Sequence, residues 1–318
     1  MNAPFDPKAA QPFLCDPSAP NELRRVAIWQ KFVVHYPAFT QIADELCDIV
    51  NLVGAEPQHV AVHACSRNGA TWLAKHLRER FPVKLDIMGD AAEQPVAYVA
   101  LPAQSSVHYF AMKVLDELKE PYNPRSSKAH LASSAYACLK NLGTKAIIID
   151  RASRLDDGYA GEVKAMKNVV TEIAEECGLS VFMFGDEDAV DLHSHSSKAI
   201  SNLFEVRGLP IWQADVTFQH LLKSYEQRFP LRERSDMAGN TELVDVVLKR
   251  TGGILDHIGQ LLRKSAIYAI QSGREKIDMT TLDGCGWIAP SHRREEARRL
   301  IGVADGRSQN KKPRKGRK

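Results

Sequence analysis

The chain has 318 residues, of which 44% are hydrophobic and 25% charged, a composition typical of a globular protein that buries a substantial core. No apolar run approaches the roughly 18 residues that a membrane-spanning helix needs, and the first residues lack the apolar stretch of a secretory signal. The composition therefore argues against a membrane-spanning, secreted, collagen-like or wholly disordered protein. The length suits one domain with an accessory lobe.

The formal net charge of +3 is the sum of two unlike regions. Residues 291–318 carry eleven Lys and Arg against three acids, whereas residues 1–290 carry a net charge of −5. Such asymmetry is typical of a chain that contacts nucleic acid, and a solubilising tail is the alternative.

The six cysteines are scattered without the paired spacing of a metal site or a redox motif. In a chain of this size they indicate reduced thiols, so we expect a cytoplasmic protein. His193 and His195 stand close together, but a metal needs three or four converging ligands, and this stretch is typical of a polar loop.

Apolar periodicity, read in chain order, predicts strands that alternate with helices. The predicted helices are 21–29, 39–52, 71–81, 107–118, 130–142, 162–177, 218–228, 243–250, 254–272 and a short one near Thr280. The predicted strands are 60–64, 95–101, 146–150, 179–185 and 203–210. Because only helices follow the last strand, we expect an α/β domain with a parallel sheet and then a helical lobe.

The loop that leaves the first strand is the place where such sheets bind phosphates. Compared with the phosphate-binding pattern G-x-x-x-x-G-K-[S/T], it keeps Gly69 and Thr71 but has alanines in place of the first glycine and the lysine. The candidate nucleotide-binding residues are Ser66, Arg67, Asn68, Gly69, Ala70, Thr71 and Asp150.

The strand 146–150 ends on a carboxylate, Asp150, which could hold Mg²⁺ together with Thr71. The alternative is that Asp150 only caps the following turn. The next position would normally hold the glutamate that activates water, but here it is Arg151. An arginine cannot accept a proton, so the sequence offers no catalytic residue at the general-base position.

The order and spacing of these motifs resemble the TniB family, AAA+ proteins related to the TnsC regulators of bacterial transposition. Further matching segments lie at 25–29, 36–39, 184–189, 209–222, 229–235, 251–255, 269–273 and 287–294. The resemblance implies a P-loop NTPase of the AAA+ type, with a parallel sheet flanked by helices and followed by a small helical lid domain. The expected domains are a flexible leader (1–20), an N-terminal helical segment (21–56), an AAA+ α/β core (57–214), a helical lid (215–285) and a basic C-terminal extension (286–318).

The resemblance also implies ATP and Mg²⁺ as cofactors, but the chain departs from the family where ATP chemistry is done. Ala70 replaces the phosphate-contacting lysine, Asp186 stands at the sensor 1 position, and Leu203 replaces the finger arginine before Phe204. Together with Arg151, these losses argue against hydrolysis. Arg67 or Arg151 could supply a replacement cation near a phosphate; otherwise the loop is collapsed and empty.

The partners that the resemblance implies are DNA, a transposase, a TniQ-like target-selection protein, and a second copy of the chain or a related AAA+ subunit, all in the bacterial cytoplasm and without a membrane. The expected DNA-binding residues are Lys311, Lys312, Arg314, Lys315, Arg317 and Lys318, because clustered cations bind phosphates independently of sequence. For the arginines of 293–299 we favour ion pairs with Glu295 and Glu296 on a solvated helix.

The sequence thus predicts a pseudo-ATPase of DNA transposition that acts by assembly and by bridging DNA, transposase and target-selection protein. Two alternatives stay open: an active or nucleotide-gated ATPase with non-standard phosphate contacts, and a non-enzymatic adaptor tethered to DNA.

Overall fold

The computed structural model describes residues 15–30, 32, 34–52, 54, 56–85, 91–103, 105–157, 159–186 and 203–302. The described residues of Val33–Gln213 and Ile254–Asp256 form one compact unit, and those of Ala10–Phe32, Ala214–Gly253 and His257–Lys318 form a second. Within the described ranges, no helix combines the length and the apolar character that crossing a membrane requires.

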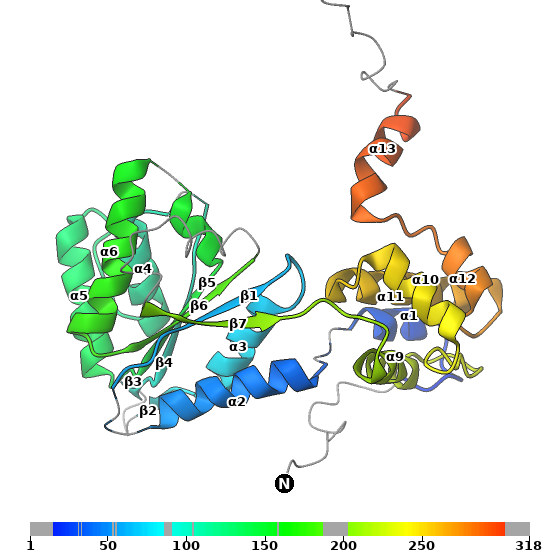
Figure 1. Cartoon of the computed structure of the whole chain (residues 1–318), viewed down its shortest axis with the longest axis horizontal. Coiled ribbons are helices and arrows are strands. Elements are labelled where there is room, and N and C mark those ends of the chain that lie inside the picture. The colour runs from blue at the N-terminus through cyan, green and yellow to red at the C-terminus, as the bar shows by residue number, and fades with distance from the viewer. Residues whose placement is uncertain are drawn as a thin grey trace, which may run out of the picture. The chain divides into compact units, whose positions relative to one another are not determined.

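The first unit is built around a parallel sheet with the strand order β4-β5-β6-β1-β7 (Figure 1). The strands are β1 (Val60–Ala64), β4 (Val96–Ala100), β5 (Ala146–Asp150), β6 (Ser180–Gly185) and β7 (Glu205–Leu209). They coincide with the five predicted apolar runs, and the predicted α/β fold is confirmed. Because the strands are parallel, their carboxyl ends lie at one edge of the sheet, which is where the phosphate-binding pattern begins.

Helices cover both faces of this sheet. They are α2 (Pro37–Asn51), α3 (Ala70–Arg80), α4 (Val107–Leu118), α5 (Lys128–Asn141) and α6 (Ala160–Glu176), with a short 3₁₀ helix, η1 (Ala152–Asp156), after β5. Alternate residues of β5 point to opposite faces, so Ile147 and Ile149 pack with α4, α5 and α6, while α3 lies on the other face (Figure 1). All five residues of β5 are buried, as expected for a strand covered on both sides.

A small antiparallel pair of strands, β2 (Lys84–Leu85) and β3 (Ala91–Glu93), was not predicted. Both strands are too short to show an alternating pattern, and the two residues of β2 are exposed. Strand pairs of this length leave no periodic signal in a sequence.

The second unit is helical, as predicted for the lobe after the sheet. Its helices are α1 (Asn21–Trp29), α9 (Val216–Arg228), α10 (Thr241–Thr251), α12 (Met279–Gly284) and α13 (Pro290–Leu300), together with α11 (Leu255–Ser272) from His257 onward, since Leu255 and Asp256 belong to the first unit. Asp215, Asn240 and Asp278 cap α9, α10 and α12, each accepting a backbone N–H three residues on. Phe218 of α9, Val247 of α10 and Ile258 of α11 are completely buried in the core of this unit.

Candidate functional site

The candidate phosphate loop lies between β1 and α3, as the sequence pattern predicts. Gly69 is the N-cap of α3 and has a φ of 108°, a conformation that glycine adopts without steric cost. Arg67 also has a positive φ of 67°, which is uncommon for a residue with a side chain. Asn68 N–H donates to the carbonyl of Cys65 at 2.9 Å, so the loop makes a tight turn before the helix begins.

The loop and the end of β5 bring Thr71 and Asp150 together. Thr71 Oγ1 lies 3.2 Å from Asp150 Oδ1, and the backbone N–H of Arg151 donates to the same oxygen at 2.9 Å. Asp150 is only 2% exposed, so its carboxylate is held almost entirely by protein groups. The contact with the N–H of Arg151 is local, to the next residue, and the helix η1 that follows has no side-chain cap.

Tyr98 of β4 is a member of this cluster that sequence reasoning missed. Its hydroxyl donates to Asp150 Oδ2 at 2.7 Å, so both carboxylate oxygens have protein donors. Burial and the adjacent Asp150 carboxylate raise the pKa of the Tyr98 phenol, which therefore stays protonated and remains a donor at neutral pH. The available signal was a lone tyrosine in a strand otherwise made of valine and alanine, two residues before the carboxyl end.

Arg151 occupies the general-base position with an exposed side chain. Its φ of 62° and ψ of 47° are left-handed, and it forms the N-cap of η1. A proton acceptor is absent from this position because a guanidinium has no lone pair to offer at physiological pH.

The other predicted loop residues divide into exposed and buried ones. Ser66 and Arg67 are exposed, Ala70 and Thr71 are half-buried, and Asn68 has no exposed surface. Asn68 Nδ2 donates to the carbonyls of Leu209 and Pro210 at 3.3 and 2.8 Å. Asn68 therefore fixes the loop to the end of β7 and has no amide hydrogen bond left for a phosphate.

Arg67, the replacement cation considered from the sequence, has an ion pair of its own. Its Nη1 lies 3.0 Å from Asp256 Oδ2, at the start of α11. Both side chains are partly exposed, so the pair is worth little to stability, but it turns the guanidinium toward a carboxylate.

These residues fit one of the two implied cofactors better than the other. Thr71 Oγ1 and Asp150 Oδ1 are oxygen ligands of the kind that Mg²⁺ prefers. A triphosphate needs a cation and free N–H donors in the loop, whereas position 70 is alanine and Arg67 is paired. The two oxygens therefore suit a magnesium ion, whereas the loop lacks the lysine of the phosphate-binding pattern. Elsewhere in the described ranges, no group of three or more His, Cys, Asp or Glu side chains could hold a metal.

The sensor and finger positions also lack the family residues. The buried Oδ1 of Asp186 has no hydrogen-bond partner among the described residues. Leu203 packs against the core beside Phe204, whose ring lies 5.8 Å from that of His59. Residues 187–189, the histidines His193 and His195, and the predicted DNA-binding residues 311–318 lie outside the described residues.

The basic segment 293–299 is part of α13, which has no buried residue. Arg299 pairs with Glu296 at 2.7 Å, and Arg293 Nη2 donates to Gln260 Oε1 at 2.9 Å. The favoured solvated helix is thus present, and its ion pair between Arg299 and Glu296 spans three residues.

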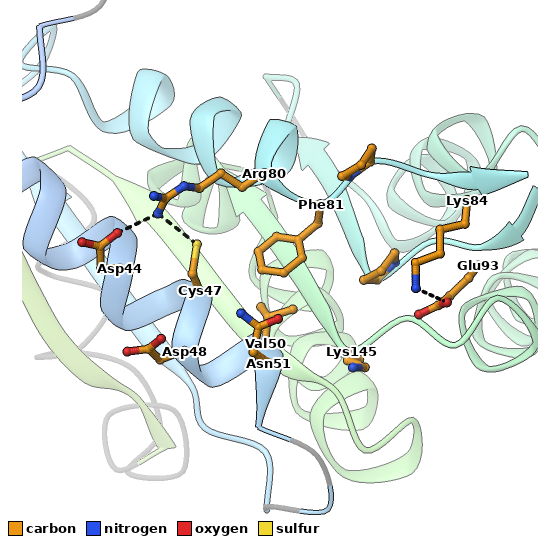
Figure 2. Close-up of a pocket in the computed structure, with 12 residues that line it drawn as sticks. Asp44, Cys47, Asp48, Val50, Asn51, Arg80, Phe81, Lys84, Glu93 and Lys145 are labelled. Carbon is orange, nitrogen blue, oxygen red and sulfur yellow. Dashed lines mark hydrogen bonds and ion pairs between the residues drawn. The ribbon is translucent and has the colours of Figure 1, made fainter. Parts of the chain in front are cut away.

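A pocket of about 620 Å³ opens at the opposite, amino edge of the sheet, next to residues that precede β4 and β5. Figure 2 shows Arg80 directed at Asp44 and Cys47, and Lys84 directed at Glu93. The charged lining consists of Asp44, Asp48 and Glu93 and of Arg80, Lys84 and Lys145. Because the two signs balance and most of these groups pair with one another, the pocket selects no ligand charge and does not extend the site at Asp150.

Comparisons with known proteins agree with this architecture. The family model described as bacterial TniB protein matches residues 24–214. No curated protein gives a significant match. Among solved structures, the chain is similar to the ORC2 protein of Aeropyrum pernix in its ADPNP–ADP complexes, with 14% identity, 82% of this chain and 71% of that chain covered, and a TM-score of 0.60. It is also similar to Cdc6p of Pyrobaculum aerophilum, with 14% identity, coverage of 79% and 67%, and a TM-score of 0.55. The Walker-type ATPase of Pyrococcus abyssi matches with 13% identity, coverage of 82% and 72%, and a TM-score of 0.52. At these identities the similarity shows the fold alone.

Proposed function

This chain belongs to the bacterial TniB family, and from that premise we propose that it is a transposition-associated AAA+ protein that acts by assembly and partner binding without hydrolysing ATP. In this proposal the α/β core (57–214) and the helical lid (215–285) form the AAA+ body. The leader (1–20) and the helical segment (21–56) precede it, and the basic extension (286–318) follows it.

One observation carries the proposal: the residue that follows the buried Asp150 is Arg151, which cannot act as a base. Hydrolysis needs a group that orients and deprotonates water, a cation at the transferring phosphate and a finger arginine, and the chain has Arg151, Ala70 and Leu203 at these three positions. The finger alone contributes about 10³–10⁵ in rate where it operates. Losing all three leaves no route by which one residue compensates for the others.

A second candidate, a nucleotide-gated ATPase, is favoured by the 3.2 Å approach of Thr71 Oγ1 to Asp150 Oδ1. If Mg²⁺ binds in this proposal, Thr71 and Asp150 hold it, and the ion supplies positive charge to phosphate oxygens. Tyr98 and the N–H of Arg151 orient the Asp150 carboxylate in either case.

A phosphate-release assay on the full chain with ATP and Mg²⁺, with and without DNA, separates these candidates. We expect no turnover above that of Asp150→Ala. The variant that combines Ala70→Lys with Arg151→Glu restores the phosphate-contacting lysine and the general-base carboxylate. Its turnover is compared with that of the natural chain. Turnover by the natural chain that Asp150→Ala abolishes would overturn the proposal.

We propose that the partners are DNA, a transposase, a TniQ-like target-selection protein and further AAA+ subunits, through the basic extension and the AAA+ body. Residues 311–318 carry six of the chain's cations and no acid, which supports contact with DNA phosphates. Gel shifts that compare the full chain with one truncated after Gly302 test this assignment. Replacing the six Lys and Arg residues of 311–318 by Gln should weaken DNA binding and reduce its dependence on salt concentration. Unchanged DNA binding would place the DNA contacts on the AAA+ body instead.

A further inference from the structure

The loop between β1 and α3 binds the segment 254–256 with both backbone and side chains. The N–H of Leu255 donates to Asn68 Oδ1 at 3.1 Å, and the N–H of Asp256 donates to the carbonyl of Arg67 at 3.3 Å. Two consecutive loop residues thus accept the first N–H groups of α11, which have no partners inside their own helix. The loop acts as the cap of a helix that begins 187 residues after Asn68.

These contacts leave the loop little freedom to reshape around a ligand. The side-chain amide of Asn68 donates to the carbonyls of Leu209 and Pro210 and accepts from the N–H of Leu255. The side chain of Leu255 covers Gly69, since a methyl group built on that glycine would lie 3.7 Å from Leu255 Cδ2. One side of the loop, at Asn68 and Gly69, is therefore in contact with Leu255, while Ser66 and Arg67 stay exposed.

The charges complete the arrangement. Arg67 is the only cation in 65–71, and its guanidinium lies 3.0 Å from the Asp256 carboxylate. A carboxylate and a phosphate oxygen are both anions that a guanidinium binds through N–H groups. Asp256 thus pairs with the guanidinium that would otherwise attract a phosphate. The negative charge of Asp256 also repels other anions that approach Arg67.

We propose that Asp256 is an intramolecular ligand of the loop, which binds the chain's own carboxylate where related loops bind a nucleotide phosphate. The inference rests on the proposed function, because it explains how a loop of this fold keeps its shape without nucleotide. It adds a specific consequence: a polyphosphate reaches Arg67 only by displacing Asp256.

The test is the affinity of Mg²⁺–ATP for the full chain, measured by titration calorimetry, in the natural protein and in Asp256→Asn. We expect Asp256→Asn to bind about tenfold more tightly, since it frees Arg67 and removes a repelling charge. Asp283→Asn is the matched control, because Asp283 is another partly exposed carboxylate paired with an arginine, Arg250, and the charge change is the same. The double variant Arg67→Ala/Asp256→Asn should lose the gain.

Equal affinities of Asp256→Asn and the natural chain would overturn the proposal, as would an equal gain in Asp283→Asn, which would reflect net charge alone. If Asp256→Asn does not fold by circular dichroism, Asp256→Ser repeats the measurement with a residue suited to a first helical turn. Failure here is distinguishable from failure of the proposed function, which is decided by turnover sensitive to Asp150→Ala. A gain in binding without turnover supports both.

Discussion

Arg24 of α1, which has no exposed surface, forms a two-point ion pair with Glu275, 251 residues later in the chain. The guanidinium also donates to the carbonyl of Pro230 at 2.8 Å and to Asn21 Oδ1 at 3.2 Å. Each of these contacts is to an acceptor, and the buried charge is compensated, as a buried ion requires. Within the helical unit, this pair holds α1 against the segment that follows α11.

Removing the arginine should be costly because the largely buried Glu275 then keeps only the backbone N–H of Arg232 at 3.3 Å and the Arg232 guanidinium at 3.9 Å. We expect Arg24→Ala to lose about 3–5 kcal/mol of unfolding free energy, measured by urea denaturation followed by circular dichroism. The matched control is Arg25→Ala, since Arg25 is the neighbouring residue on the same helix and is exposed. That control should change stability by less than about 0.5 kcal/mol. Similar losses in the two variants would contradict the assigned role of Arg24.

The same pair predicts a pH dependence. Hydrogen bonds from Arg24 hold the pKa of the Glu275 carboxyl below its ordinary value of 4.5. A depressed folded-state pKa contributes stability that is fully present above the ordinary value and is lost as the pH falls through the folded value. The stability difference between the natural chain and Glu275→Gln should therefore be constant from neutral pH to about pH 5 and should shrink at lower pH. Urea midpoints of both proteins across this range measure it; a difference that grows on acidification would have the wrong sign.

Tyr98 gives a separate test of the Asp150 cluster. Tyr98→Phe keeps the ring but removes the donor to Asp150 Oδ2, so we expect a loss of about 1.5 kcal/mol, typical of a hydrogen bond to a charged group. Tyr159→Phe makes the same chemical change at a side chain that is 88% exposed and should be neutral. Thermal denaturation of the two variants beside the natural chain makes the comparison. Equal midpoints for all three would show that the hydroxyl does not hold Asp150.

The sheet could be predicted from sequence because its strands are continuous apolar runs such as 146–150, which bury both faces. The approach of Thr71 to Asp150 could be anticipated for a similar reason: parallel strands bring their carboxyl ends together. Tyr98 could not be assigned, because its role depends on the register of β4 against β5, and a sequence contains no register between separate strands.

The buried structural roles of Arg24 and of Asn68, which the sequence offered only as a nucleotide-binding candidate, were not predicted for another reason. A polar residue inside a helical pattern or a loop is normally expected to face water, and both of these are fully buried. Their burial is explained only by acceptors and donors far away in the chain, at Glu275 for one and at Leu209 and Leu255 for the other. Such long-range satisfaction of polar groups leaves no local pattern.

Asn68 is therefore the residue whose loss should most directly loosen the loop. Asn68→Ala leaves the N–H of Leu255 and the carbonyls of Leu209 and Pro210 without their side-chain partner, and we expect a loss of about 2–3 kcal/mol. Asn141→Ala, at an exposed position in the last turn of α5, is the matched control and should change stability by less than about 0.5 kcal/mol. Amide hydrogen exchange adds a local readout: the N–H of Leu255 should exchange faster in Asn68→Ala, because its acceptor is gone, while amides of the buried strand β5 keep their protection. Unchanged exchange at Leu255 would mean that Asn68 does not cap α11, whatever the global stability shows.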